Sequence, residues 1–567
     1  MMRKFVIVTA AFLAAACSTL PATRPARSPL APAVAGPVEI QILAFNDFHG
    51  NLETPPPVEV TGADGMKRKI VTGGAAHLAA TISQLRIGPN SVTVSAGDTI
   101  GASPLISANY LDEPTIEAMN LLGLEFNAVG NHEFDRGVAE LKRMQNGGCE
   151  QYTRRKPCVV EPFVGARFPY LAANVVQPDG STIFPSAGLK TFRTDAGRIT
   201  IGFIGMTLKG TKNLVTPSGV AGVEFKDEAE TANALVPKLR AEGADAIVLL
   251  IHQGGKTANF TTGNNCDGFY GDILPILPKL DPAIATIISG HTHWAYVCRG
   301  TPQVGSGRLL TSAGKYGYFV TDLRLRFDRS THQLVGQDAT NVVVSTRESD
   351  NQVKAFVDRY AAAVAPVGDR VIGRLTETAK KSDDDGESPA ADLIADSMLT
   401  ATRAPETGGA QLGLVNSTGV RVDLPGGDVK YKDAFAMMPF GNNLVVMTLT
   451  GAQLKAALEQ QYAIPLRPKA TRPAVLAPST GFTYAVDLKR PVGSRIADMR
   501  LNGTPLAADG RYRVVLNNYL ASGGDSLTAF TAGTDVKDTG IIDLDALVAW
   551  IAQGQSPPRN DRIKLSL

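Results

Sequence analysis

Five short polar blocks, each placed directly after a short apolar run, constrain this chain more than any other feature. Two of them are Val129-Gly-Asn-His-Glu-Phe-Asp-Arg-Gly137 and Gly290-His-Thr-His293. The other three are Asp47-Phe-His49, Gly97-Asp98 and His252. Together they hold five of the seven histidines, which scatter would rarely produce, so we interpret them as parts of one site. His77 and His332 have no such block around them and are interpreted as structural.

The apolar runs before the blocks are rich in Val and Ile and predict β-strands. Helical patterns lie between some of them. The predicted strands cover residues 38–45, 91–95, 126–129, 199–204, 246–251 and 285–288, and the predicted helices cover 75–84, 114–122 and 227–241. This alternation indicates a layered α/β domain with a largely buried sheet. Ligands of such folds collect at the carboxyl ends of the strands, where the five blocks stand.

Length and composition limit the class of protein. A chain of 567 residues is too long for one ordinary core, so two or more domains are expected. Hydrophobic residues make up 44% and charged residues 19%, which is typical of a globular protein. The net charge of +2 gives no reason to expect a nucleic-acid partner. Beyond the N-terminus, no apolar run reaches the roughly 20 residues that span a bilayer.

The N-terminus is interpreted as an export signal. Arg3 and Lys4 precede an apolar stretch over 5–16 that ends at Cys17, and this order resembles a bacterial lipoprotein signal over 1–17. Cys17 would then carry lipid, which would be the chain's contact with a membrane. An ordinary signal peptide cut nearby is the alternative. Residues 18–37, rich in Pro and Ala, are expected to form an extended tether. The protein is therefore expected to be exported, to the periplasm or to the outer membrane as an anchored lipoprotein.

The other four cysteines are even in number, which in an exported protein predicts disulfides. Three pairings of Cys149, Cys158, Cys266 and Cys298 are open. Cys149–Cys158 closes a short loop at low entropic cost, and it leaves Cys266–Cys298 as its complement.

A second domain is expected after residue 370. Residues 38–345 form the first domain, and a charged helical segment over 346–370, broken at Pro366 and Gly368, reads as a linker helix. The second domain then covers 371–567. Within it, Ser388-Pro389 predicts a helix start, and Thr450-Gly-Ala-Gln453 resembles a capping box.

The side chains of the blocks suit divalent metal ions. Imidazole, carboxylate and amide ligands together favour Zn²⁺, Mn²⁺, Co²⁺ or Fe²⁺. Seven candidate ligands are too many for one catalytic ion, and two ions that share a carboxylate would use them all. These ligands are Asp47, His49, Asp98, Asn131, His252, His291 and His293. Two such ions against two carboxylates leave a formal surplus of two positive charges, which attracts an anionic ester and activates a bound water for attack.

The loop that carries Asn131 also offers an acid–base group. His132 follows Asn131 directly, so the loop can turn its ring from the metals toward a substrate. Asp135 would orient that ring and raise its pKa.

In this order, the blocks resemble the calcineurin-type metallophosphoesterases. Within them, the chain is similar to the secreted bacterial 5′-nucleotidase/UDP-sugar hydrolase family along nearly all of 38–560. The resemblance implies a four-layer α/β/β/α first domain and an α+β substrate-binding second domain. It makes Asp98 the bridging ligand and His132 with Asp135 the catalytic pair. It also implies that Asn416 and Arg421 meet phosphate oxygens, and that Phe440 stacks on a nucleobase.

Two departures from the family weaken the nucleotide assignment. The loop Ser522-Gly-Gly-Asp525 continues with Leu527, where the family has a second stacking ring. Phe530 is the nearby alternative. The run Asp383–Asp385 stands where better-known nucleotidases have an arginine, and its charge would repel phosphate. We expect weak discrimination among bases.

The leading interpretation is an exported, monomeric two-metal hydrolase that releases phosphate from nucleoside monophosphates and related nucleotides. One alternative on the same scaffold is hydrolysis of sulfur esters. The other is a non-catalytic surface lipoprotein that binds nucleotides, which the intact His132–Asp135 pair disfavours.

Overall fold

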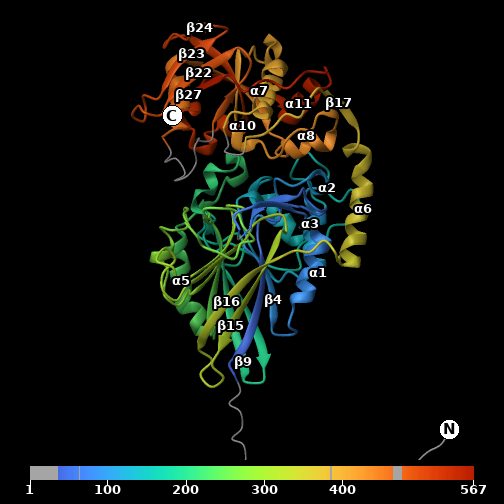
Figure 1. The fold of residues 1–567 in the computed structure, drawn as a ribbon, viewed down its shortest axis with the longest axis vertical. Coiled ribbons are helices and arrows are strands. Elements are labelled where there is room, and N and C mark those ends of the chain that lie inside the picture. The colour runs from blue at the N-terminus through green and yellow to red at the C-terminus, as the bar shows by residue number, and fades with distance from the viewer. Residues whose placement is uncertain (1–35, 63, 383–385, 464–474, 567) are drawn as a thin grey trace, which may run out of the picture.

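A computed structural model describes residues 36–62, 64–382, 386–463 and 475–566 of the chain. The predicted signal peptide, Cys17, nearly all of the predicted tether and the acidic run 383–385 lie outside the described residues. In the described part, two structural regions lie one above the other, and helix α6 runs along one side of both (Figure 1).

The N-terminal region is built on two six-stranded sheets. The first has the order β16-β15-β1-β4-β5-β6, and the second has the order β13-β14-β12-β11-β9-β8. The strands of the first sheet are β1 (Val38–Phe45), β4 (Ser91–Ser95), β5 (Phe126–Ala128), β6 (Tyr170–Leu171), β15 (Phe319–Phe327) and β16 (Leu334–Val343). Those of the second are β8 (Ala187–Thr194), β9 (Gly197–Thr207), β11 (Ala246–His252), β12 (Thr286–Ser289), β13 (Ala295–Arg299) and β14 (Leu309–Ala313).

The two sheets face each other across an apolar core. Buried side chains from both, such as Ile42, Val94, Phe203 and Val248, form one cluster between them. Helices α1 (Ala75–Leu85) and α3 (Glu113–Leu122) contribute to a second core outside the first sheet, and α5 (Glu228–Ala241) to a third outside the second sheet (Figure 1). The expected four-layer α/β/β/α arrangement is therefore confirmed.

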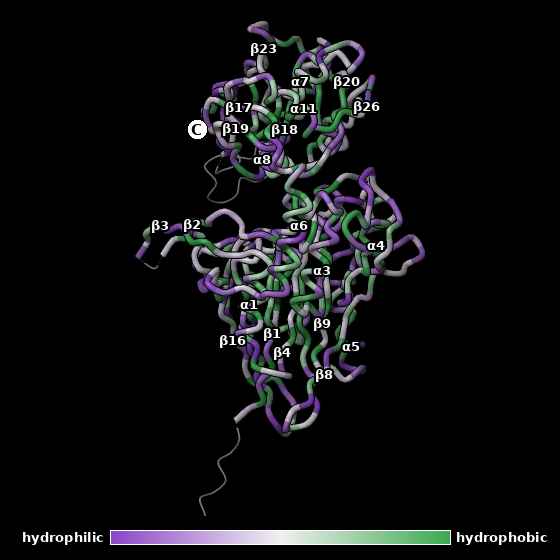
Figure 2. Tube along the Cα trace, turned by 90° about the vertical axis from the view of Figure 1, so that its right-hand side faces the viewer, coloured by the Kyte–Doolittle hydropathy of each residue, from purple (hydrophilic) through white to green (hydrophobic). Residues whose placement is uncertain are grey.

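The six strands and three helices predicted in this region are all present, with ends that differ by a few residues. Shorter elements join them. These are α2 (Leu105–Ala108), α4 (Val138–Asn146), β7 (Val175–Val176), β10 (Glu224–Phe225) and the hairpin of β2 (Val58–Thr61) and β3 (Lys67–Ile70). The hairpin projects from the body of the molecule (Figure 2).

Helix α6 (Asn351–Gly368) leads from the N-terminal to the C-terminal region. It begins where Asp350 accepts hydrogen bonds from the backbone N–H groups of Gln352 and Val353. The prediction that Pro366 breaks this helix was wrong, because the helix continues to Gly368. The proline lies in the last turn, where the lost N–H removes a single backbone hydrogen bond.

The C-terminal region is α+β, as expected. A five-stranded sheet has the order β21-β18-β25-β20-β26, and a four-stranded sheet has the order β24-β23-β22-β27. Their strands are β18 (Leu412–Asn416), β20 (Asn443–Thr450), β21 (Leu476–Pro478), β22 (Phe482–Asp487), β23 (Ile496–Leu501), β24 (Thr504–Pro505), β25 (Arg511–Asn517), β26 (Thr534–Ile542) and β27 (Ile563–Ser566). The pair β17 (Val371–Leu375) and β19 (Gly427–Lys430) and five helices complete it: α7 (Pro389–Thr402), α8 (Tyr431–Met437), α9 (Gly451–Gln460), α10 (Asn518–Ala521) and α11 (Asp543–Ile551).

Both helix starts predicted in this region are confirmed. The Ser388 hydroxyl accepts from the N–H of Ala391 at the start of α7. At the start of α9, Thr450 and Gln453 exchange hydrogen bonds as a capping box.

The disulfides are Cys149–Cys158 and Cys266–Cys298, the pairing expected from the short loop. Across the described ranges, none of the helices has both the length and the apolar character needed to cross a membrane.

Candidate functional site

The carboxyl ends of neighbouring parallel strands bring the five polar blocks together. In the first sheet, β1 pairs in parallel with β4, and β4 with β5. In the second, β11 pairs in parallel with β12. The blocks stand just after these strands, so all seven predicted ligands meet at one end of the two sheets.

Most of the candidate ligands have a strained backbone conformation. Five of the seven have a positive φ: Asp47 (50°), His49 (48°), Asp98 (48°), His291 (73°) and His293 (60°). Few residues other than glycine adopt this conformation, and it costs energy that the surrounding structure must supply. Such strain concentrates where side chains have to point at one target.

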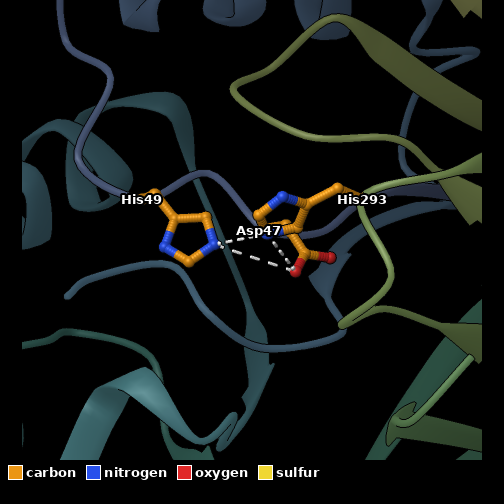
Figure 3. A group of neighbouring side chains, drawn as sticks. All are labelled: Asp47, His49 and His293. Carbon is orange, nitrogen blue, oxygen red and sulfur yellow. Dashed lines mark hydrogen bonds and ion pairs between the residues drawn. The ribbon is translucent and has the colours of Figure 1, made fainter. Parts of the chain in front are cut away.

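The first group of candidate ligands is Asp47, His49 and His293 (Figure 3). Asp47 Oδ1 lies 3.9 Å from His49 Nε2 and 3.5 Å from His293 Nε2. The two ring nitrogens are 3.0 Å apart. All three ligand atoms lie within 4.8 Å of one another, so the group could hold a metal ion.

The second group is Asp98, His252 and His291, with the same mutual reach of 4.8 Å. Asn131 joins it, because its Oδ1 lies 3.0 Å from His291 Nδ1. Asp98 connects the two groups. Its Oδ2 lies 2.9 Å from His252 Nε2 in the second group and 3.7 Å from His49 Nε2 in the first.

The chemistry of these donors fits divalent cations. Burial holds the pKa of His49 and of His293 well below the usual range, so both rings are neutral and offer a lone pair. Burial would also lower the pKa of His252, but Asp98 outweighs it and raises that pKa to about 10. His252 Nε2 is buried and has no hydrogen-bond partner among the described residues, although Asp98 is close. A cation bound by both side chains would satisfy this nitrogen and the carboxylate.

His132 and Asp135 form a pair beside the two groups. His132 Nδ1 lies 2.9 Å from Asp135 Oδ2. Burial alone would lower the pKa of His132, but the charges of Asp135 and Asp98 outweigh it and raise that pKa. The backbone N–H of His132 donates to Asp98 Oδ1 over 2.9 Å, which ties this loop to the carboxylate between the groups.

The C-terminal region contributes two predicted side chains to the same place. The ring of Phe440 stacks on His132, with centroids 6.2 Å apart. The Arg421 guanidinium lies 5.8 Å from the centroid of the Phe440 ring. Arg421 and Phe440 therefore stand on the His132 side of the site and come from the opposite region of the chain.

Asn416 is placed differently. Its amide donates to Thr418 Oγ1 and to Asp525 Oδ2 over 2.9 and 3.0 Å. Asp525 in turn lies 2.6 Å from the hydroxyl of Tyr519, which is 3.1 Å from the carbonyl oxygen of Asn213 in the N-terminal region. Asn416 thus belongs to a polar cluster at the contact between the two regions. Among the described residues, its side chain forms hydrogen bonds within this cluster and none with Arg421.

The expectation that Leu527 replaces a ring at the base site was wrong. Leu527 is 3% exposed and Phe530 is fully buried, and both pack in the core of the C-terminal region. Leu527 directly follows the short helical turn Gly524–Ser526, and its side chain is buried although that of Ser526 is exposed.

Two features of the site were not predicted from the sequence. Glu133, inside the Asn131 loop, accepts hydrogen bonds from the N–H groups of Asp98, Thr99 and Gly130 and so joins two ligand loops. Tyr316 has its ring centroid 6.0 Å from those of both His49 and His293. The one signal in the sequence was position, since Lys315 and Tyr316 follow strand β14 just as the five blocks follow theirs.

His77 and His332 lie outside the site, as expected. His77 Nδ1 is 2.6 Å from the carbonyl oxygen of Glu348, and His332 Nε2 is 2.9 Å from that of Ala196.

Comparison with known proteins gives two family matches. Residues 40–295 match the family model of the calcineurin-like phosphoesterases, and residues 370–532 match that of the 5′-nucleotidase C-terminal domain.

Individual relatives extend the similarity along most of the chain. The cell wall protein Lmo0130 of Listeria monocytogenes is 31% identical over 562 residues, which cover 93% of this chain and 69% of that protein. The endonuclease YhcR of Bacillus subtilis is 28% identical over 542 residues, 93% of this chain but 41% of that protein. The chain therefore spans less than half the length of this second relative.

Among solved structures, a 5′-nucleotidase precursor from Thermus thermophilus superposes with a TM-score of 0.73 at 27% identity. The superposition covers 93% of this chain and 99% of that one.

Proposed function

The chain belongs to the 5′-nucleotidase family of calcineurin-like phosphoesterases and is a metal-dependent phosphoester hydrolase, and we propose that it releases phosphate from nucleoside 5′-monophosphates and related nucleotides. One observation carries this proposal. Asp98 lies within 3.7 Å of a ring nitrogen in each of two metal-ligand groups, and the His132–Asp135 pair, Arg421 and Phe440 surround the same place.

In this proposal, two divalent ions are held by one ligand group each. Asp47, His49 and His293 hold one ion, Asp98, His252, His291 and Asn131 hold the other, and Asp98 serves both. Zn²⁺, Mn²⁺, Co²⁺ and Fe²⁺ all suit these ligands. When bound, the pair of ions polarises the phosphoryl oxygens and makes a nucleophile from water at neutral pH.

The other side chains have distinct roles. His132, oriented by Asp135, donates a proton or hydrogen bond to the phosphoryl oxygens or the leaving group, which its raised pKa favours. The Arg421 guanidinium binds the phosphate, whose geometry matches its planar donors. Phe440 offers a ring for the nucleobase. Leu527 and Phe530 are buried and offer no second ring, so weak discrimination among bases is still expected.

We also propose that the protein is exported, that Cys17 is lipidated, and that the chain acts as a monomer. The sequence before residue 36 supports export. Phase separation in detergent tests the anchor. Mature protein should enter the detergent phase and a Cys17→Ser variant should not, whereas wild-type protein found only in the aqueous phase would refute lipidation.

A substrate panel tests the activity. Purified protein supplied with Mn²⁺ or Zn²⁺ should release phosphate from nucleoside 5′-monophosphates and, more weakly, from an aryl phosphate. His132→Ala should keep its metals and lower kcat by roughly 10²–10⁴-fold. Release of sulfate from a sulfur ester without phosphate release would favour the sulfur-ester alternative. Nucleotide binding with no turnover of any substrate would favour a binding protein.

A further inference from the structure

The connection between β14 and β15 contains a second set of polar residues at the metal-ligand end of the sheets. It reads Gly314-Lys315-Tyr316-Gly317. The backbone N–H of Tyr316 donates to the carbonyl oxygen of Asp47 over 2.8 Å, so this segment is fixed to the first ligand loop.

Tyr316 is held in an unusual conformation. Its φ is +56°, a region that aromatic side chains rarely occupy. The neighbouring positions 314 and 317 are glycines with positive φ, which shows that the turn itself favours residues without a Cβ. A tyrosine kept in such a turn points to a use for its side chain.

The ring of Tyr316 forms a wall of the first ligand group. Its centroid lies 6.0 Å from the rings of His49 and of His293, and the side chain is half-buried. The Lys315 ammonium lies 4.5 Å from the centroid of the Tyr316 ring. The pair therefore places one hydroxyl and one cation at the edge of the site.

Lys315 and Arg421 approach the same ligand group from the two regions of the chain. The Lys315 ammonium lies over the Tyr316 ring, which stands beside His49 and His293. The Arg421 guanidinium lies over the Phe440 ring, which stacks on His132, and the His132 ring is 5.1 Å from that of His49. Among the described residues, neither Lys315 nor Arg421 forms an ion pair with a carboxylate. Two uncompensated cations beside a dinuclear metal site favour an anion between them.

We infer that Lys315 and Tyr316 bind an anionic oxygen of the substrate's phosphate from the N-terminal region, opposite Arg421 in the C-terminal region. This inference rests on the proposed function, because it adds two substrate-binding residues to the same site. The tyrosine hydroxyl donates a hydrogen bond and the lysine supplies charge, so an anion held by both regions also holds the regions together.

The test measures inorganic phosphate binding by calorimetry, together with KM and kcat for an aryl phosphate. Tyr316→Phe keeps the ring and removes the hydroxyl, and Lys315→Met keeps the length and removes the charge. Each should weaken phosphate binding and raise KM by about 10-fold, with a smaller effect on kcat, as for loss of one hydrogen bond to a charged group. The metal content should not change.

Matched controls come from the same chain. Tyr318→Phe removes a buried hydroxyl whose ring is 5.7 Å from that of Tyr316, and Lys489→Met removes an exposed lysine in the C-terminal region. Both should bind phosphate as the wild type does.

The outcomes distinguish failure of this inference from failure of the proposed function. If wild-type protein hydrolyses phosphoesters and Tyr316→Phe and Lys315→Met bind phosphate as tightly as it does, the inference is overturned and the proposed function stands. If wild-type protein neither binds phosphate nor releases it, both are overturned. Thermal unfolding of each variant shows whether weaker phosphate binding results from misfolding. If one of the two variants is misfolded, phosphate binding by the other variant tests the inference.

Discussion

Asp98→Asn is the most direct test of the arrangement of the metal site. Asp98 is 1% exposed, and its Oδ2 is 2.9 Å from His252 Nε2 and 3.7 Å from His49 Nε2. Asparagine keeps the shape and one oxygen but removes the negative charge. Because the charge lies between the two ligand groups, its loss should weaken the binding of both ions rather than one.

The size of the effect follows from the charges. Two unit charges about 4 Å apart attract by about 4 kcal/mol at an effective dielectric constant of about 20, and a divalent ion doubles this. Much of that gain is offset, since an aspartate costs more to desolvate than an asparagine. Removing one partner of a buried charge pair costs about 3–5 kcal/mol in practice. We therefore expect affinity for each ion to fall by about 10²–10⁴-fold.

The assay is elemental analysis after dialysis against metal buffers of graded free concentration. Wild-type protein should retain two ions per chain at concentrations where Asp98→Asn retains neither. Asp543→Asn is the matched control, because Asp543 is also buried (3% exposed) but lies in the C-terminal region, and it should retain both ions. Loss of a single ion, with the second held at wild-type affinity, would refute the shared carboxylate.

Three further predictions concern the C-terminal region. Burial raises the pKa of Asp543 from 3.8 to about 7, so unfolding releases a proton between about pH 4 and 7, and the free energy of unfolding should fall as pH rises through this window. The fall should be at most about 4 kcal/mol, and urea unfolding at pH 4 to 8 measures it. It should vanish in Asp543→Asn but remain in the exposed control Asp545→Asn. Leu527→Phe should overpack the core and lower the free energy of unfolding by about 1–3 kcal/mol. The KM for a purine monophosphate should not change, and a lower KM would show that this position does face the base. Thr450→Ala removes the capping box of α9 and should cost about 1 kcal/mol in the same urea assay, and an unchanged midpoint would contradict the role of the cap.

Much of the first region could be predicted from local sequence. Apolar runs of Val and Ile define strands because a buried parallel sheet needs apolar side chains on both faces. The ligands could be predicted for a related reason. Loops after parallel strands meet at one edge of a sheet, so Asp47, Asp98 and Asn131 had to lie near one another once β1, β4 and β5 were neighbours. Helix starts at Ser388 and Thr450 were equally local, since a cap needs only the first turn of its helix.

Other features depended on which segments the fold brings together. The division of the ligands into two groups, with Asp98 between them, depends on how the two sheets face each other across their common core. Leu527 was misplaced because a motif position does not say whether its side chain points into the core or the cleft. Pro366 did not end α6, because its place in the last turn limited the cost.

Tyr316 shows the difference most clearly. Its place after a strand is visible in the sequence, but the residues around it are those of an ordinary glycine-rich turn, and the chain separates it from His49 by more than half of the first region. Only the closing of strands β14 and β1 into adjacent sheets places its ring 6.0 Å from His49 and His293, with Lys315 beside it. Sequence determines which side chains follow each strand, whereas contacts between loops of different sheets arise from tertiary packing and leave no local pattern.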